Sequence, residues 1–172
     1  MLLPRFKYKC RTCEEIHEGF PALVFDAPCP YYSVPNLERE RRCRKSDDLC
    51  SVDDFRFVRC VLEYPIVDSN EIMSWGVWGS LSKENFELYV QHSAAQSRDH
   101  IGPFFSWFSN SLPASEYPET MSLKCEIIIR NNHLRPCLHL EPTDHPLSVE
   151  QRGGISLAKA LRLAQPIISW HS

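Results

Sequence analysis

The sequence has no long apolar run, which argues against a membrane-spanning helix. The longest apolar stretches, EIIIR at 126–130 and PIISW at 166–170, are far shorter than the roughly 20 residues that a helix needs to cross a bilayer. The opening MLLPRFKYKC also lacks the apolar core and the small-residue cleavage site of a signal peptide. We therefore expect a cytoplasmic protein.

Basic residues are not in excess either. The chain holds 19 lysines and arginines against 22 aspartates and glutamates, a formal net charge of -3. A general nucleic-acid binder usually carries a basic surplus, and a membrane-surface protein carries a basic amphipathic face. The densest basic run, RERRCRK at 39–45, is more typical of a solvated helix face. We expect no nucleic acid and no membrane as partners.

Motifs of several common enzyme families are missing as well. The sequence contains neither GxGxxG nor GxxxxGK followed by Ser or Thr, so nucleotide binding has no motif support, and it contains no HExxH. Glycine is scarce, with 6 residues against 13 prolines, which predicts many rigid turns. The length of 172 residues suits one domain, 1–172.

What the chain does contain is a mixture of strand-like and helix-like segments. Strands are expected at 6–10, 55–66, 71–81, 121–130 and 134–141, and helices at 36–45, 83–92 and 157–165. The proline-bearing segment 20–36 is expected to be irregular. This order predicts an α+β fold, mainly an antiparallel sheet with a few helices packed on one face. The cysteine-bearing segment 1–50 should pack on this main body.

Periodicity indicates which side chains form the core. The face of the strand at 55–66 that should be buried comprises Val58, Cys60, Leu62 and Tyr64. Ser82 is expected to cap the helix at 83–92, whose buried face would hold Phe86, Tyr89 and Val90. Five further aromatic residues are expected in the core, with room for one tryptophan at a groove edge: Trp75, Trp78, Phe104, Phe105 and Trp107.

The stretch CRTCEEIHEG at 10–19 has the spacing of half a zinc site. Structural zinc is usually held by four cysteine and histidine ligands, often with two cysteines separated by two residues. Cys10 and Cys13 have this spacing, and His17 follows. No second pair with similar spacing occurs, so further ligands would have to come from distant positions. A zinc site in a knuckle-like turn and a bare pair of thiols both remain open.

A third interpretation of this stretch is a redox pair. A CxxC pair with a lowered thiol pKa usually opens a helix in a thioredoxin-like βαβ unit. The acidic residues in EEIHEGFP, which follow the pair, are expected to raise a thiol pKa instead. Cys60 and Cys125 lie inside strand-like runs and are expected to be ordinary buried thiols.

The polar segment EPTDHPLSVEQRGG at 141–154 offers a weak candidate for catalysis. Asp144 beside His145 suggests a general base and its orienting group. No nucleophile motif such as GxSxG accompanies them, and capping explains the segment better, with Asp or Thr at the cap and Pro146 in the first helical turn. A catalytic role for His145 would be abandoned if both of its ring nitrogens were bonded to backbone groups.

Several longer segments of the chain resemble one bacterial family. They are the opening CxxC with its histidine, SDDLC at 46–50, WGVWGSLSKENFELY at 75–89, FFSWFSNSLP at 104–113, YPETMSLK at 117–124 and LRPCLHLEPTDHPLSVEQRGGIS at 134–156. On these segments the chain resembles the uncharacterised bacterial proteins of domain-of-unknown-function family 2199. The resemblance implies a bacterial cytoplasmic protein and supplies no activity.

The same resemblance bears on the metal ligands. It favours Cys50, within SDDLC, as a further ligand, with Cys43 and Cys29 as weaker candidates. The expected ligand set is therefore Cys10, Cys13, Cys50 and His17. The family prefers glycine after the second cysteine, where it would help the backbone curl around a metal, whereas this chain has Glu14. At 105–108 the family tends to read FGWL where this chain has FSWF.

Taken together, the residues favour a non-enzymatic protein that acts by binding a protein partner. In this hypothesis a structural zinc would hold the N-terminal segment. An enzyme using His145 and Asp144 is the alternative, and a thiol redox protein is a further one.

Overall fold

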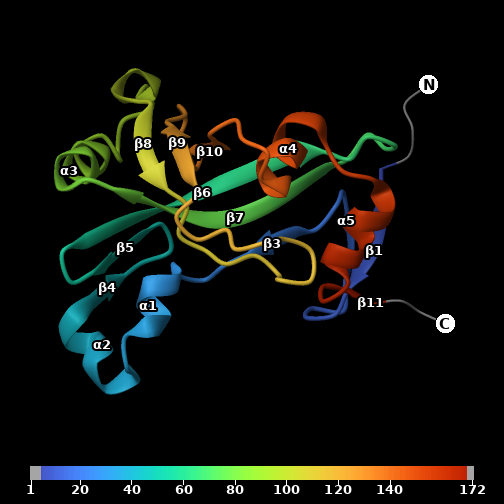
Figure 1. The fold of residues 1–172 in the computed structure, drawn as a ribbon, viewed down its shortest axis with the longest axis horizontal. Coiled ribbons are helices and arrows are strands. Elements are labelled where there is room, and N and C mark those ends of the chain that lie inside the picture. The colour runs from blue at the N-terminus through green and yellow to red at the C-terminus, as the bar shows by residue number, and fades with distance from the viewer. Residues whose placement is uncertain (1–4, 170–172) are drawn as a thin grey trace.

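The computed structural model describes residues 5–169 and divides them between two sheets (Figure 1). The elements are β1 (Lys7–Cys10), β2 (Ile16–Glu18), β3 (Ala22–Val24), α1 (Cys29–Ser33), α2 (Asn36–Arg42), β4 (Cys43–Lys45), β5 (Leu49–Val52), β6 (Phe55–Pro65), β7 (Ile72–Leu81), α3 (Lys83–Gln91), the 3₁₀ helix η1 (Asp99–Ile101), β8 (Phe104–Trp107), β9 (Lys124–Ile128), β10 (Cys137–Leu140), α4 (Pro146–Gly153), α5 (Leu157–Ala164) and β11 (Ile168–Ser169). None of the helices in this part of the chain has the length and apolar character needed to cross a bilayer.

The main sheet has eight strands and is built around the long β6–β7 hairpin. Its order is β3-β7-β6-β10-β9-β8, and the hairpin of β4 and β5 joins it through β6. Most neighbours are antiparallel, including β9 and β10, which form the expected hairpin. Two pairs, β3 with β7 and β6 with β10, are parallel. The α+β class and the mainly antiparallel sheet are confirmed.

The main sheet curls until its last strand returns to β7. Gly79 of β7 forms a bridge with Phe108, and the Ser109 amide donates to the Trp78 carbonyl at 2.9 Å. A Cβ atom on Gly79 would lie 2.6 Å from Ser106 Oγ and 2.9 Å from Ile127 Cδ1. Glycine is therefore required here by the close approach of the strands, in agreement with the role of glycine inside strands.

The β6–β7 hairpin carries a buried core on each face. One core contains Val58, Cys60, Leu62 and Tyr64, as the alternation predicts, together with Tyr89, Leu147 and Ala160 from the helices α3, α4 and α5. The opposite core is smaller and comprises Val34, Cys43, Cys50, Val52, Phe57 and Trp78. Tyr31 of α1 packs against the smaller core, so helices contribute to both faces of the sheet.

Three local expectations differ from the structure. The helix expected at 36–45 ends at Arg42, because Cys43 turns into the smaller core and starts β4. The segment 20–36 is not irregular throughout, since it contains β3, α1 and the start of α2. Of the face expected to be buried in α3, Tyr89 is buried but Val90 is 38% exposed.

The aromatic residues expected in the core also separate into two groups. Trp75, Trp78 and Phe104 are buried. Phe105 is 56% exposed and Trp107 is 42% exposed, because alternate side chains of β8 point outward. Trp107 lines a groove of about 360 Å³ on this surface, so one tryptophan does lie at a groove edge.

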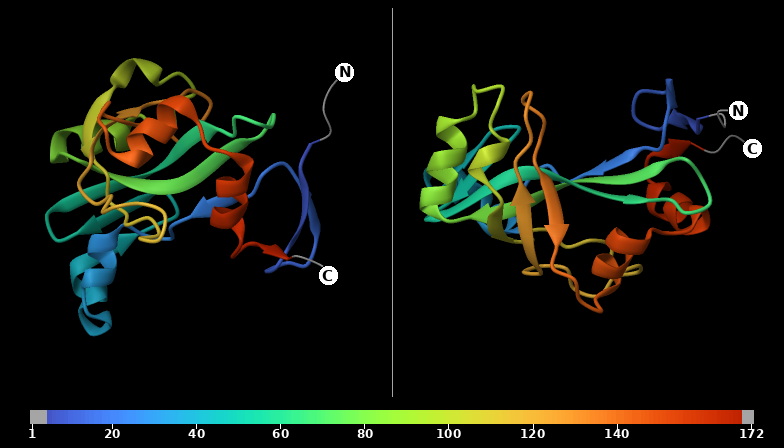
Figure 2. Two further views of the ribbon diagram at one scale, coloured as in Figure 1. Left: turned by 45° about the vertical axis from the view of Figure 1, so that its right-hand side comes forward. Right: turned by 90° about the horizontal axis from the view of Figure 1, so that it is seen from above.

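The second sheet joins the two ends of the described chain. It has the order β11-β1-β2, and both of its pairs are antiparallel. Figures 1 and 2 show it at one end of the molecule, beside α5 and away from α3 and the β4–β5 hairpin. Glu71, just before β7, accepts hydrogen bonds from the Phe6 amide at 2.7 Å and the Phe20 amide at 3.2 Å. This carboxylate thereby anchors the terminal sheet to the main body.

The expected N-terminal segment 1–50 is distributed over both sheets in its described part. Residues 7–18 form β1, β2 and their turn, whereas β3 and the hairpin of β4 and β5 belong to the main sheet.

Candidate metal centre

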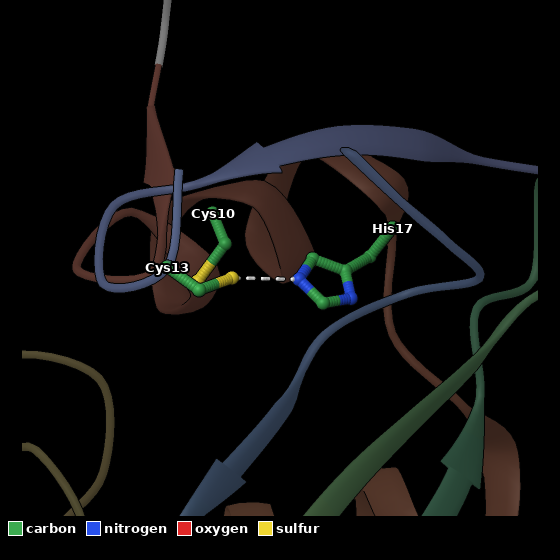
Figure 3. A group of neighbouring side chains, drawn as sticks. All are labelled: Cys10, Cys13 and His17. Carbon is green, nitrogen blue, oxygen red and sulfur yellow. Dashed lines mark hydrogen bonds between the residues drawn. The ribbon is translucent and has the colours of Figure 1, made fainter. Parts of the chain in front are cut away.

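The candidate metal centre lies in the turn of the β1–β2 hairpin. Cys10 ends β1, Cys13 lies in the turn and His17 is the middle residue of β2. The Cys10 amide donates to the Glu15 carbonyl at 2.9 Å, and the Glu14 amide donates to the Cys10 carbonyl at 3.0 Å. These two bonds close the turn and place the three side chains on one side of it (Figure 3).

Glu14 gives the turn its sharp curl. Its φ is 61°, in the left-handed region that glycine adopts more easily than other residues. This explains why a glycine would suit the position after the second cysteine. The backbone of this chain makes the same curl with a glutamate, so Glu14 does not prevent a knuckle-like turn.

The three side chains converge closely enough to share one ion. One ligand atom from each of Cys10, Cys13 and His17 lies within 4.8 Å of the others. Cys13 Sγ is 3.0 Å from His17 Nε2, the contact drawn in Figure 3. The His17 ring is held by stacking on Tyr8, with ring centroids 5.4 Å apart. Cys10 and His17 are half-buried, whereas Cys13 is exposed.

The backbone of the turn favours the thiolate form of Cys10. Hydrogen bonds from backbone N–H groups, of Cys13 first and of Thr12 second, lower the pKa of the Cys10 thiol below its usual value. The Thr12 amide lies 3.4 Å from Cys10 Sγ. The expectation that nearby acidic residues would raise the thiol pKa is thus wrong for Cys10, because local backbone donors dominate. Thiolate is the form of cysteine that binds metals.

The structure does not bring Cys50 to this centre. Cys50 lies in β5, buried in the smaller core with Cys43, and burial raises the pKa of its thiol to about 12. Cys29 begins α1, where its sulfur accepts a hydrogen bond from the Ser111 amide at 3.3 Å. Within residues 5–169, Cys10, Cys13 and His17 form the one group of three or more such ligands.

Cys60 and Cys125 are the buried thiols that the sequence predicts. Both are at most 4% exposed. Burial raises the pKa of both thiols, to about 12 for Cys125. A thiol that remains protonated is a poor nucleophile, so these two cysteines serve as apolar core residues.

His145 caps a helix and does not meet the requirements of a general base. Its Nδ1 accepts a hydrogen bond from the Leu147 amide at 3.1 Å, and its Nε2 lies 3.2 Å from the Glu119 carbonyl, to which it donates. Both ring nitrogens are therefore bonded to backbone groups, and His145 is the N-cap of α4. Asp144 is exposed beside it. We assign neither residue a catalytic role.

The rest of the segment 141–154 is likewise engaged in holding the fold together. Gln151 donates to the Leu138 carbonyl at 2.7 Å and accepts from the Leu140 amide at 2.8 Å, which fixes α4 to β10. Arg152 donates to the Thr143 carbonyl at 2.9 Å. These bonds account for the compact polar composition of the segment.

Sequence reasoning missed a chain of polar side chains in the larger core. Trp75 Nε1 donates to the Tyr64 hydroxyl at 2.8 Å, which lies 3.0 Å from the Tyr117 hydroxyl. Tyr117 in turn donates to Glu150 at 2.7 Å, and Glu150 forms an ion pair with Lys159. Burial raises the pKa of Tyr117 and raises that of Tyr64 to about 12. No motif marks these residues, because they come from five different segments.

Comparison with known proteins supports a family assignment. No match was found among curated proteins or among solved structures. The model of one protein family matches residues 9–155, which include the three candidate ligands and every strand of the main sheet. This match confirms the resemblance seen in the sequence. The chain belongs to domain-of-unknown-function family 2199, described as an uncharacterised protein conserved in bacteria.

Proposed function

We propose that this chain is a non-enzymatic, cytoplasmic interaction protein whose terminal sheet is stabilised by a zinc ion bound to Cys10, Cys13 and His17. The convergence of these three ligand atoms within 4.8 Å is the observation that carries the proposal. Two sulfurs and an imidazole nitrogen are a donor set that suits zinc better than calcium, magnesium or manganese. The lowered pKa of the Cys10 thiol favours the same binding.

A metal at this position would stabilise a small sheet that has little core of its own. β1, β2 and β11 contain four, three and two residues, and β2 leaves Ile16 73% exposed. Because an ion that binds the folded hairpin does not find the same site in the unfolded chain, its binding free energy adds to the stability of the hairpin. Structural zinc sites commonly contribute in this way.

Three ligands leave the fourth tetrahedral position open. Cys13 is the exposed member of the group, so this position is expected to face solvent. A water molecule would complete the site in the isolated protein.

The positions of the two catalytic candidates, His145 and Asp144, support a non-enzymatic role. His145 uses both ring nitrogens for backbone contacts. The family match adds no activity. The eight cysteines are unpaired in the structure, which fits the reducing cytoplasm.

The lowered pKa of Cys10 also supports a second candidate, thiol redox chemistry. Against it, the pair lies in the turn of a β-hairpin and not at the start of a helix, where redox CxxC pairs usually lie. Rapid labelling of Cys10 and Cys13 by iodoacetamide in the native, metal-loaded protein would favour redox chemistry. Slow labelling that becomes rapid after chelation would favour zinc.

Metal analysis of protein purified without chelator tests the zinc proposal directly. We expect about one zinc per chain. A Cys10→Ser/Cys13→Ser double variant should lose the zinc and some thermal stability, whereas the control Cys137→Ser, in β10 of the main sheet, should keep the zinc. Absence of zinc from the unaltered protein, with no zinc uptake on addition, would refute the site.

The interaction role has a separate test. The full chain would be used as bait in an extract of its own bacterial host, with the zinc-free double variant as a parallel bait. Specific recovery of a protein partner is expected. Failure to recover any partner across growth conditions would contradict the interaction role without bearing on the metal.

A further inference from the structure

A basic groove is lined by residues of β4, β5, β6 and α3. Figures 1 and 2 show α3 and the β4–β5 hairpin at the opposite end of the molecule from the terminal sheet. The groove consists of two adjoining cavities of about 400 Å³ and 450 Å³, which share Ser46 and Leu49 in their walls. Each has the size of an ordinary ligand pocket. Arginines line both cavities.

Strand register aligns the first two of these arginines. Arg44 of β4 lies opposite Ser51 of β5, and Ser51 lies opposite Arg56 of β6. Residues directly opposite on neighbouring strands point to the same face of a sheet. Two guanidinium side chains therefore flank one hydroxyl side chain in a row across three strands, on the face towards Phe86 of α3.

Neither of these arginines is neutralised within the described residues. Arg44 donates through Nη1 to the carbonyls of Glu40 and Cys43, and Arg56 donates through Nη1 to those of Asp53 and Phe55. None of the ion pairs formed by residues 5–169 includes Arg44 or Arg56. The two side chains lie on either side of Ser51, so an anion above Ser51 would be attracted to both guanidinium groups.

The second cavity is also lined by arginines, Arg98 and Arg135. Arg98 is only 4% exposed and donates to the carbonyls of Arg130 and Leu134 at 3.0 Å and 2.9 Å. Its guanidinium also lies over the ring of Tyr89, and ion pairs within the described part of the chain do not include it. Arg98 is thus a fixed positive charge in the wall of the groove.

Other charges of the groove are already paired. Lys45 contacts Asp26 at 3.2 Å, and Arg135 contacts Asp48 at 2.7 Å. His133 lies 3.2 Å from the Ser93 carbonyl through Nδ1. The positive charges that remain for direct contact with a ligand are therefore those of Arg44 and Arg56, while the buried Arg98 adds positive potential to the second cavity.

We propose that this groove binds an acidic peptide segment of a partner protein. Charge complementarity selects the class of ligand, since a carboxylate fits the fork of a guanidinium through two parallel hydrogen bonds. Leu49 and Phe86 give the groove apolar wall between the arginines, which suits a segment carrying both acidic and apolar side chains. The formal net charge of -3 disfavours a polyphosphate chain, which would extend over the surrounding surface.

This inference rests on the interaction role proposed above and specifies where the partner binds. The zinc site lies in a different sheet, so zinc content reports on the metal proposal and not on the groove. Conversely, peptide binding tests the groove in zinc-loaded and in zinc-free protein alike.

Fluorescence anisotropy of a labelled decapeptide with six glutamates and two phenylalanines tests the proposal on the full chain. The same peptide with glutamines in place of the glutamates serves as the ligand control, and a labelled ten-nucleotide oligothymidylate serves as the competing ligand class. The protein variant is Arg44→Gln/Arg56→Gln. A matched variant, Arg41→Gln/Lys124→Gln, removes two charges from exposed positions outside the groove.

We expect the acidic peptide to bind, to weaken as salt is raised and to lose about tenfold in affinity for each guanidinium removed from the groove. The matched variant should bind the acidic peptide as tightly as the unaltered protein does, which would show that the loss is not an effect of net charge. The glutamine peptide should bind much more weakly, which would show that apolar contact alone does not give the affinity. Thermal unfolding identifies loss of folding in the groove variant, in which case single Arg44→Gln and Arg56→Gln proteins replace it. Absent binding, equal loss in the matched variant, or binding of the oligonucleotide alone would each overturn the proposal. If a partner is still recovered from the host extract, the interaction role would survive that failure.

Discussion

Replacing Glu14 by glycine should stabilise the β1–β2 hairpin, because this residue adopts a φ of 61°. The left-handed conformation costs a residue other than glycine about 1–2 kcal/mol. Glycine removes this cost but gives the unfolded chain more freedom, an opposing effect of about 0.4–1 kcal/mol. The net expected gain is about 0.5–1 kcal/mol, from the difference of these two terms.

The gain should be visible in zinc affinity as well as in stability. If folding of the turn limits metal binding, about 0.5–1 kcal/mol corresponds to a two- to fivefold tighter zinc constant. Competition with a chromogenic chelator measures that constant, and thermal unfolding in excess zinc measures stability. For a chain of this size about 1 kcal/mol raises the melting temperature by roughly 2–4 °C.

Glu15 provides the matched control. It is also exposed, but its φ does not lie in the left-handed region, so Glu15→Gly adds only the entropic cost of glycine. The two substitutions should therefore act in opposite directions. Equal destabilisation by both would refute the argument from backbone strain, and with it the explanation for a preferred glycine at position 14.

Three further predictions concern the fold. Gly79→Ala should destabilise the protein by about 1–3 kcal/mol, measured by urea unfolding, because the added Cβ would lie 2.6 Å from Ser106 Oγ; an unchanged midpoint would contradict the close approach of the strands. Glu71→Gln should leave the main sheet intact but speed hydrogen exchange in the terminal sheet, because a charged acceptor of two amides is lost; uniform exchange rates would contradict the anchoring role. Stability should be retained below pH 9 and fall as the pH rises towards 12. Burial raises the pKa of Tyr64 from 10.0 to about 12 and that of Cys125 from 9.0 to about 12, so the unfolded chain loses these protons at a lower pH than the folded protein does. Urea midpoints that do not fall between pH 9 and 11 would contradict this.

The long strands were predictable because a single pattern extends over many residues. β6 and β7 end within one residue of their predicted bounds, and the alternate face of β6 is buried as expected. Short elements carry too few residues for such a pattern. β4 follows directly after a run of good helix formers, and its pairing with β5, together with burial of Cys43 in the smaller core, makes it a strand.

The candidate metal centre was predictable where its ligands are close in sequence. Cys10, Cys13 and His17 lie within one short hairpin, so local structure alone brings their side chains together. The location of Cys50 depends on the course of the chain between the two sheets, which spacing does not encode. The cap before Pro146 was predicted, but the capping residue was not: an imidazole acts as an N-cap less often than the Thr or Asp beside it, so sequence preference selects the wrong residue.

The basic groove was not visible in the sequence because it depends on register. RERRCRK reads as one run, yet Arg42 pairs with Glu38 and Asp53 on one side, while Arg44 faces Ser51 on the next strand. The third member of the row, Arg56, comes from β6. Only the pairing of three strands reveals that two charges of this set lack partners.

The pairing of β1 with β11 sets an order of assembly. The β1–β2 hairpin is local and can close as soon as it is synthesised, whereas the bond from Arg11 to the Ile168 carbonyl spans 157 residues. Contacts of such separation form late, and a nascent chain folds from its N-terminus while the rest is still being made. The hairpin therefore keeps one edge uncovered until β11 has been synthesised. An ion held in its turn would keep that edge in register until β11 pairs with it.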